Sequence, residues 1–325
     1  MQKLMIGLAL VLSVIVTGWG MTLYYSDEPA TFDVPALALS VSAGTKPVVG
    51  FTTTNTLIHI TETLLYKPGG FISNDILPPF MLMDDMPAWE LGVLEMIRDM
   101  ALVMRTDFSR SQSQSVENSL LKQVQPKFNI EHRSWAIPSP EEEYTAATKL
   151  LRTYRQALMD PNNQEHQFFA RADNLRDWLK QAEKRLGSYS QRLSASVGQD
   201  RLNTDLAGDI SARQSTLTPD QLMVKTSWWR IDDEFYEARG ACWALLHLLK
   251  AIEVDFADVL QRKNATVSLQ QIIRELESTQ QTVWTPMVLN GSGFGVLANH
   301  SLVMANYISR ANAALIDLTE LLSQG

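Results

Sequence analysis

The sequence predicts an all-α protein in which an N-terminal transmembrane helix precedes an elongated bundle of long, antiparallel helices and one irregular segment rich in proline and glycine. Three observations lead to this fold class. Residues 4–23 contain no charged side chain over about the length of a helix that spans a bilayer. Three later stretches repeat apolar residues in alternating steps of four and three, which is typical of helices that keep one seam against a partner. Hydrophobic residues make up 45% of the chain, which is enough for a substantial core.

Residues 1–25 are predicted to form a cytoplasmic stub and a single transmembrane anchor. Lys3 precedes the uncharged run, and Tyr24 and Tyr25 follow it, where an interfacial aromatic belt would lie. The positive-inside rule then places the N-terminus in the cytoplasm and the bulk of the chain across the membrane. A cleaved signal peptide is the alternative, with Gly18-Trp19-Gly20 as a poor cleavage site. In both cases the bulk of the chain is exported.

Two regions separate this anchor from the long helices. Residues 26–54 contain three prolines and little charge, which predicts an extended tether. Residues 55–140 are predicted to combine short helices with an irregular segment. The expected elements are a helix over Asn55–Leu65, a turn at Lys67–Gly70 and helical spacing from Trp89 to Val103.

Residues 141–325 are predicted to form the long-helix bundle, which packs with residues 55–140 as one domain. Its central helix is expected over Val224–Val259, where the seam keeps the four-three spacing throughout. The middle of that helix, Gly240–Leu249, is apolar on nearly every side. It therefore needs neighbours all round.

Other helices of this region supply those neighbours. Ser139-Pro140 is a strong start signal for a helix. Phe168–Leu193 and Leu297–Leu322 are two more heptad runs, and the first passes through Gly187 without losing its pattern. Long helices with such seams pack antiparallel at a small angle, as in coiled coils. The polar stretch Gly198–Leu217 is expected to be a long loop.

Charge and composition exclude several classes of function. The net charge of -8 disfavours nucleic acid as a partner, because phosphate binding needs a basic surface. No cofactor and no metal site is predicted, since the five histidines are scattered and no HExxH motif occurs. Cys242, the single cysteine, is expected to be a small buried hydrophobe, and His247 a hydrogen-bonded core histidine.

Ten residues form the candidate functional surface, because their stretch is richer in turns, aromatics and paired charges than its neighbours. They are Lys67, Asn74, Asp75, Asp85, Trp89, Glu90, Arg98, Asp99, Arg105 and Arg110. One interpretation is an envelope-glycan hydrolase, with Asp85 and Glu90 as acid and base and Trp89 as a sugar-stacking surface. Another is a ligand-sensing or transport accessory module, in which Arg98, Arg105 and Arg110 converge on a small anion.

Three segments of this stretch resemble a family of bacterial envelope proteins that is known only as a domain of unknown function. They are YKPGGFISND (Tyr66–Asp75), MPAWELG (Met86–Gly92) and DFSRSQSQS (Asp107–Ser115). The resemblance implies a proteobacterial inner-membrane protein with one N-terminal span and a periplasmic bulk. It implies no established activity and brings no catalytic residues.

The anchor, the heptad helices and the lack of a catalytic motif together favour a non-enzymatic protein. We expect a scaffold, adaptor or assembly factor of the cell envelope that is held in the inner membrane through residues 4–23. Its expected partner is another protein or a second copy of the chain, because seam residues left unburied would be offered to it. A small-molecule ligand is the alternative partner.

Overall fold

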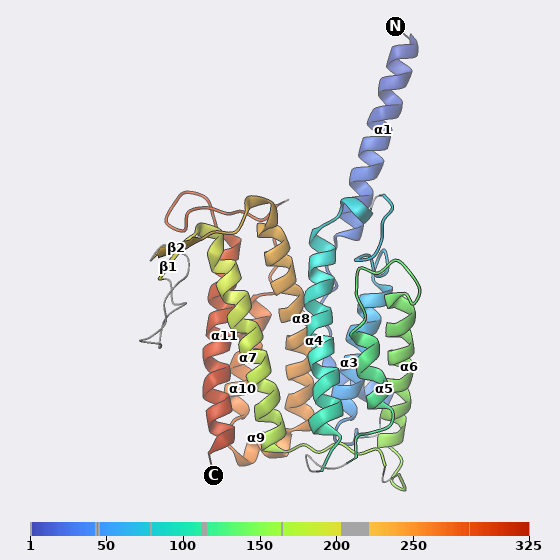
Figure 1. Ribbon diagram of the computed structural model, residues 1–325, viewed down its shortest axis with the longest axis vertical. Coiled ribbons are helices and arrows are strands. Elements are labelled where there is room, and N and C mark those ends of the chain that lie inside the picture. Colours follow the sequence, from blue (N-terminus) through green and yellow to red (C-terminus); the bar gives the residue numbers. More distant parts are fainter. Residues whose placement is uncertain are drawn as a thin grey trace, which may run out of the picture.

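The protein is built almost entirely from helices, as the sequence predicts (Figure 1). The computed structural model describes residues 2–42, 44, 46–78, 80–111, 116–163, 165–202, 221–285 and 287–324. Its α-helices are α1 (Gln2–Tyr25), α2 (Val34–Val41), α3 (Phe51–Tyr66), α4 (Asp85–Val103), α5 (Leu121–Phe128), α6 (Pro140–Leu158), α7 (Ala172–Ser194), α8 (Ile231–Asp255), α9 (Ala257–Arg262), α10 (Thr266–Ser278) and α11 (His300–Ser323). Two short strands, β1 (Gln199–Leu202) and β2 (Gln221–Val224), pair antiparallel.

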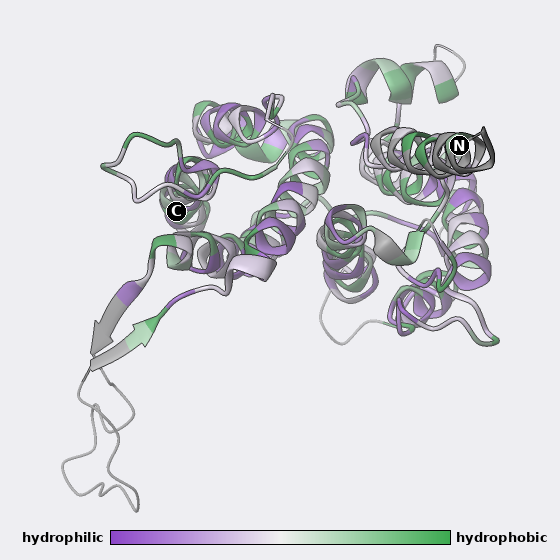
Figure 2. Ribbon diagram, turned by 90° about the horizontal axis from the view of Figure 1, so that it is seen from above, coloured by the Kyte–Doolittle hydropathy of each residue, from purple (hydrophilic) through white to green (hydrophobic). Residues whose placement is uncertain are grey.

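The helices form two four-helix units that lie side by side (Figures 1 and 2). The first unit contains α3, α4, α5 and α6, and the second contains α7, α8, α10 and α11. In each unit successive helices pack against one another, and the fourth helix packs against the first. Each unit is therefore an up-and-down bundle of the kind that heptad seams predict. Helix α1 projects from one end of the molecule (Figure 1).

The two units meet along α4 and α8, which have the most extensive contact of any helix pair. These helices run parallel. The start of α4 lies beside the start of α8, where Asp85 feels the charge of Asp232. Near their ends, the rings of Phe108 and Phe256 are 5.2 Å apart. The predicted antiparallel packing thus holds for successive helices but is wrong for this central pair, because distant helices are not constrained by a short connection.

Two glycines allow α4 and α8 to approach closely. A Cβ atom on Gly92 would collide with the backbone of α8 at Glu237, and one on Gly240 would collide with the backbone of α4 at Trp89. Only a residue without a side chain fits at such a crossing. The two helices also share a spacing of residues: Asp84-Asp85, Gly92 and Asp107-Phe108 match Asp232-Asp233, Gly240 and Asp255-Phe256. Shared spacing and equivalent helix order make the units pseudo-symmetric.

Helix α8 is the core of the molecule. All residues from Ala238 to Leu249 are buried, which confirms the prediction for Gly240–Leu249. Helices of both units surround this stretch. Cys242 is fully buried, as predicted, and burial raises the pKa of its thiol to about 12.

Several predicted boundaries shift in the structure. The central helix covers Ile231–Asp255 instead of Val224–Val259, because β2 ends at Val224 and the chain turns at Phe256 into α9. Helix α7 continues through Gly187, as predicted. Most of the predicted loop Gly198–Leu217 lies outside the described residues.

Residues 26–54 are not an extended tether. They contain α2, whose first turn is capped by the side chain of Asp33. Helix α3 also begins at Phe51, four residues before its predicted start. Its first turn is held from the other unit, because Asp255 of α8 accepts hydrogen bonds from the backbone N–H and the hydroxyl of Thr53, each at 2.7 Å. This cap was not visible as a local sequence signal.

The predicted membrane span over residues 4–23 falls within α1. Many side chains of this helix lie outside the described residues. Within the part of the chain that the structure describes, no helix reaches the length and apolar character of a membrane span.

Candidate functional site: the junction of the N-terminal segment with α8

The non-helical segment that follows α1 lies along one face of α8. Alternate residues of the segment contact every fourth residue of the helix. Two residues of extended chain and four residues of helix both advance by about 6 to 7 Å. Every second residue of the segment therefore meets every fourth residue of the helix. The contacts pair Glu28 with Arg239, Ala30 with Trp243, and Phe32 with His247.

The Phe32–His247 contact is buried and specific. The His247 ring accepts a hydrogen bond from the backbone N–H of Phe32 at 3.0 Å through Nε2, and its Nδ1 lies 2.7 Å from the carbonyl oxygen of Trp243. The rings of Phe32 and His247 stack with centroids 3.9 Å apart. Burial lowers the pKa of His247 to about 4, so the imidazole is neutral. The prediction of a hydrogen-bonded core histidine is confirmed.

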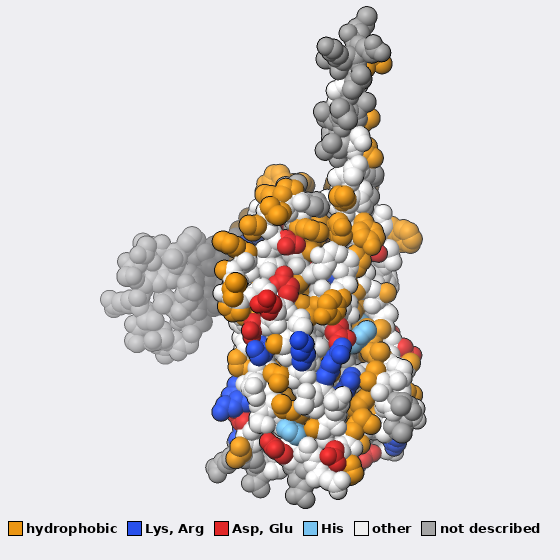
Figure 3. Space-filling model, turned by 90° about the vertical axis from the view of Figure 1, so that its right-hand side faces the viewer, with side chains coloured by type: hydrophobic (Ala, Val, Ile, Leu, Met, Phe, Trp, Pro, Cys, Tyr) orange, Lys and Arg blue, Asp and Glu red, His pale blue; other side chains and the backbone are white. Residues whose placement is uncertain are grey.

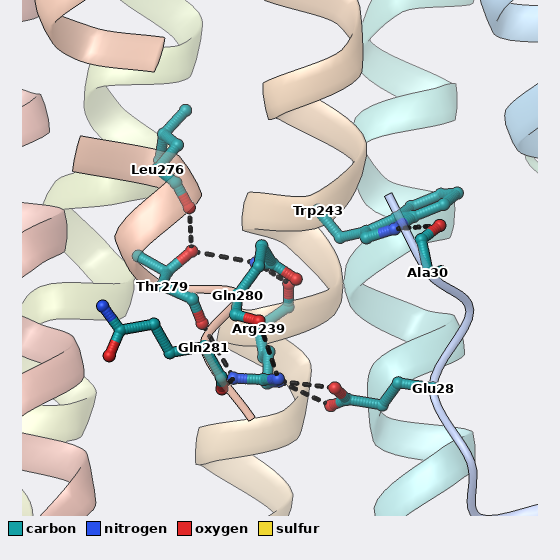
Figure 4. Close-up of polar contacts among 8 residues, drawn as sticks. All are labelled: Glu28, Ala30, Arg239, Trp243, Leu276, Thr279, Gln280 and Gln281. Carbon is teal, nitrogen blue, oxygen red and sulfur yellow. Dashed lines mark hydrogen bonds and ion pairs between the residues drawn. The ribbon is translucent and has the colours of Figure 1, made fainter. Parts of the chain in front are cut away.

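Arg239 joins three parts of the chain (Figure 4). Its Nε donates to the carboxylate of Glu28 at 2.6 Å, and its Nη1 donates to the carbonyl oxygens of Thr279 and Gln281, each at 2.8 Å. Those carbonyls follow α10, where the last turn leaves acceptors without partners in the helix. Arg239 is only 6% exposed. One guanidinium therefore fastens the N-terminal segment to α8 and to the end of α10.

Two open grooves flank Arg239. The first measures about 640 Å³ and lies between residues 26–31 and the chain around Gln280. The second measures about 250 Å³ and is more apolar, and its walls include Phe235, Trp284, His300, Val303 and Met304. Burial raises the pKa of Glu28, and the Arg239 charge opposes this shift.

Four carboxylates gather near this junction, at the parallel starts of α4 and α8. Burial, together with the charges of Asp84, Asp232 and Asp233, raises the pKa of Asp85 to about 7. Burial and the charges of Asp84 and Asp232 raise the pKa of Asp233 to about 6. Among the described residues, no group of three metal-ligating side chains is arranged to hold a metal ion.

Lys67 and Glu90, both predicted site residues, form a buried ion pair. Their side chains are 1% and 0% exposed. Glu90 also accepts hydrogen bonds from the backbone N–H groups of Ile72 at 2.9 Å and Ser73 at 2.8 Å. Lys67 donates in addition to the carbonyl oxygen of Gly70. The pair is a latch that shapes the connection between α3 and α4.

The latch argues against the proposed hydrolytic pair. The carboxylate of Glu90 is saturated by protein donors and shielded from solvent. Asp85 instead faces the acidic residues of α8. Trp89 is 0% exposed, with its ring 5.3 Å from that of Trp243, so it cannot stack on a sugar. The expectation that these three residues line one cleft is wrong, because the α4–α8 contact buries Trp89 and the α3–α4 connection covers Glu90.

The remaining predicted residues act as separate structural contacts. Asn74 donates to the carbonyl oxygen of Ser134 at 3.2 Å and to Glu141 at 3.1 Å. Nearby Asp75 has its pKa raised by burial and by the Glu141 charge. Asp99 accepts from Arg185 of α7 at 2.9 Å, which ties the two units together.

The three predicted arginines do not converge on one anion site. Arg98 donates to the carbonyl oxygens of Phe128 and Ile130, each at 2.7 Å, at the end of α5. Arg105 lies within the π-helical turn Met104–Phe108, which continues α4, and it pairs with Glu117 at 2.8 Å. Arg110 is half-buried farther along the chain.

Sequence reasoning missed Glu28 and Arg239. Glu28 was assigned to a tether, and Arg239 stood beside the apolar stretch Gly240–Leu249 without a visible partner. An arginine at the edge of such a stretch is the one signal that could have been used, because a buried guanidinium needs carboxylate or carbonyl acceptors.

Comparison with known proteins identifies the family. Residues 1–325 match the model of a family described as "Uncharacterized protein conserved in bacteria (DUF2333)". No curated protein and no solved structure matches the chain.

Proposed function

The chain belongs to this bacterial family over residues 1–325, and on that premise we propose that it is a single-pass inner-membrane protein whose helical domain is a non-enzymatic scaffold or adaptor of the cell envelope. In this proposal α1 is the anchor, its N-terminus is cytoplasmic, and the two four-helix units are periplasmic.

The docking of residues 28–32 on α8 carries the proposal. A flexible tether would let the bundle rotate freely about its anchor. Here Glu28 and Phe32 are bound instead to α8, the central helix of the second unit, which also packs against α3 and α4 of the first unit. The bundle is thereby held in a defined orientation relative to α1, which a docking platform needs and a freely diffusing enzyme does not.

The features of α1 support an anchor. Its 24 residues give a helix of about 36 Å, longer than the roughly 30 Å apolar layer of a bilayer. Lys3 is at its start, Tyr24 and Tyr25 are at its end, and residues 4–23 carry no charge.

Reporter fusions and crosslinking test the two parts of this proposal. A phosphatase that is active only in the periplasm, fused after Gln324, should be active, and a fluorescent protein that folds only in the cytoplasm should be dark at the same position. Photo-crosslinkers at exposed positions, activated in intact membranes, should yield a reproducible protein adduct, a second copy included. An inactive phosphatase would refute the topology, and repeated lack of any adduct would refute the scaffold.

A ligand-binding accessory module is the second candidate, because of the apolar groove of about 250 Å³ beside Arg239. Native mass spectrometry of the purified full chain should then detect a co-purified small molecule. Val303→Trp would fill the groove from α11 and abolish this adduct, whereas Val267→Trp at the start of α10 would leave it. An identical spectrum for both variants would exclude the groove as the site.

A further inference from the structure

The exposed aromatic side chains of the bundle share one end of the molecule. In an up-and-down unit, successive connections alternate between the two ends. The connections that precede α4, α6, α8 and α11 all lie at the end from which α1 projects (Figure 1). Among the described residues outside α1, each strongly exposed aromatic ring belongs to these connections or to the end of α3 beside them. These residues are Tyr66, Trp135, Trp228, Trp229, Trp284 and Phe294.

Aliphatic side chains join these rings. Ile76, Leu77, Ile137, Val296 and Leu297 are each more than half exposed in the same connections. Apolar side chains gather accordingly around the base of α1 (Figure 3). The opposite end exposes aliphatic side chains, such as Val116 and Val267, but no strongly exposed aromatic ring among the described residues. The molecule is therefore polarised, with its aromatic surface toward the helix that enters the membrane in our proposal.

One ring contact relates the depth of this surface in the membrane to that of α1. Tyr25, at the end of α1, packs edge-on against Phe80 in the connection before α4, with ring centroids 5.0 Å apart. Tyr and Trp at the end of a membrane helix sit at the headgroup level of the bilayer. If Tyr25 lies at that level, the connection that holds Phe80 lies there too.

We propose that the α1-proximal end of the bundle is a lipid-contact surface, which rests its aromatic side chains in the interfacial layer of the membrane that α1 crosses. The inference depends on the proposed function for the insertion of α1. A bilayer fits better than a protein partner, because the exposed apolar residues are spread over the connections before α4, α6, α8 and α11, across the whole end from which α1 projects. The contact depends on apolar burial more than on anionic headgroups, because the exposed Arg230 pairs with Glu234 and the nearby Asp84 and Asp232 add negative charge at this end.

The lone cysteine makes a direct test practical. Cys242 is fully buried, so a fluorophore on a second, exposed cysteine reports one position. The full chain, in phosphatidylcholine vesicles with brominated acyl chains, would carry the fluorophore at Val296→Cys, at Val267→Cys or at Leu12→Cys. The first two are matched valines at opposite ends, 104% and 75% exposed, and the third reports on α1.

The expected result is loss of most emission at positions 296 and 12, with no loss at 267. Loss at 12 without loss at 296 would overturn the lipid-contact surface and leave the anchor intact. No loss at 12 would overturn the anchor itself, and with it the proposed function. Loss at all three positions would mean that the bundle lies flat on the membrane, which also contradicts an end-on contact.

A second set of variants tests the cause of the contact. Trp284→Ser together with Phe294→Ser should abolish the quenching at position 296 and keep it at position 12. Both side chains are more than 90% exposed, so the melting temperature should stay unchanged. Adding anionic lipid should not increase the quenching. If quenching at 296 needs anionic lipid, or survives the double substitution, the apolar basis of the contact is wrong.

Discussion

Both four-helix units use an arginine of their second helix to bind carbonyl oxygens at the end of their third helix. Arg98 of α4 does so for α5, and Arg239 of α8 does so for α10. The difference lies in what else the guanidinium holds. Arg239 also binds Glu28 of the N-terminal segment, whereas among the described residues Arg98 donates to carbonyl oxygens of its own unit. The anchor segment is thus coupled to the unit that is farther away in sequence.

The central helices α4 and α8 also differ in whether their contacts stay within one unit. In the first unit, Glu90 of α4 and Lys67, which directly follows α3, form the buried ion pair that holds the connection between these helices. On α8, the corresponding stretch has become apolar on all sides and accepts helices of both units. The two units therefore share a helix arrangement but differ in their contacts. The first unit stabilises its own connection, and the second unit binds the N-terminal segment.

The largest effect is expected from breaking the latch of the first unit. Lys67→Met would leave Glu90 buried without its counter-charge, which costs about 3–5 kcal/mol of unfolding free energy. Chemical denaturation of the full chain measures this loss. Replacing both residues, as Lys67→Met with Glu90→Gln, should recover part of it. An unchanged midpoint for the single variant would contradict the role of the latch.

The contact between the units is tested by its glycines. Gly240→Ala and Gly92→Ala should each lower the unfolding free energy by about 2–4 kcal/mol, because a Cβ would collide with backbone that cannot move aside. Gly187→Ala in α7 is the matched control, since its nearest neighbour would be a side-chain atom of Asn312 at 3.7 Å. That substitution should be neutral or stabilising by up to about 1 kcal/mol. Similar losses at Gly92 and Gly240 would support the pseudo-symmetry, and unequal ones would weaken it.

The coupling specific to the second unit is tested at Glu28. Glu28→Gln should raise amide hydrogen exchange in residues 28–32 by about tenfold or more, because hydrogen bonds to charged groups contribute about 1.5–3 kcal/mol. Exchange in the first unit should stay unchanged. Glu62→Gln, which breaks the exposed pair with Arg152, is the control and should change little. Equal exchange in both variants would show that Glu28 does not hold the segment.

The smallest net effect is expected from pH, because Asp85 and His247 act in opposite directions. The pKa of Asp85 is raised to about 7 from its ordinary value of 3.8, so the folded protein binds more protons than the unfolded chain between these values. Asp85 therefore makes stability fall as the pH rises from about 4 to 7. His247, with a pKa lowered to about 4, acts in the opposite direction.

Two substitutions separate the contributions of Asp85 in the first unit and Asp233 in the second to the pH dependence of stability. Asp85→Asn should flatten the fall in the denaturation midpoint between pH 5 and pH 8. Asp233→Asn should flatten it less, because its pKa is raised only to about 6. A larger effect of Asp233→Asn would reverse this ranking of the two units.

The sequence predicted helices and burial better than it predicted partners. The apolar stretch Gly240–Leu249 indicated a helix covered on all sides, and the structure confirms it. The heptad pattern marks a seam but not the direction of the helix that fills it, so the parallel α4–α8 pair could not be predicted. The repeat that links Gly92 with Gly240 was present in the sequence, but each glycine alone looked unremarkable within its helix.

The polar contacts were harder to predict for a physical reason. Glu90 is a buried latch, yet in sequence it has the same appearance as a solvated glutamate of a helix surface. Glu28 and Arg239 are 211 residues apart, and no local pattern reports so distant a partner. In the structure, the candidate residues with assigned contacts take part in packing and capping.

Contacts between α8 and the N-terminal part of the chain have a consequence for folding during synthesis. The first unit is complete in sequence at Leu158, yet Asp255, which caps α3, and Arg239, which holds Glu28, emerge from the ribosome much later. Long-range contacts of this kind slow folding, because the segment synthesised first cannot form them until its partner has been made. Residues 28–32 and the first turn of α3 therefore lack these contacts until α8 has been made, and a chaperone that acts on the nascent chain would meet them in that interval.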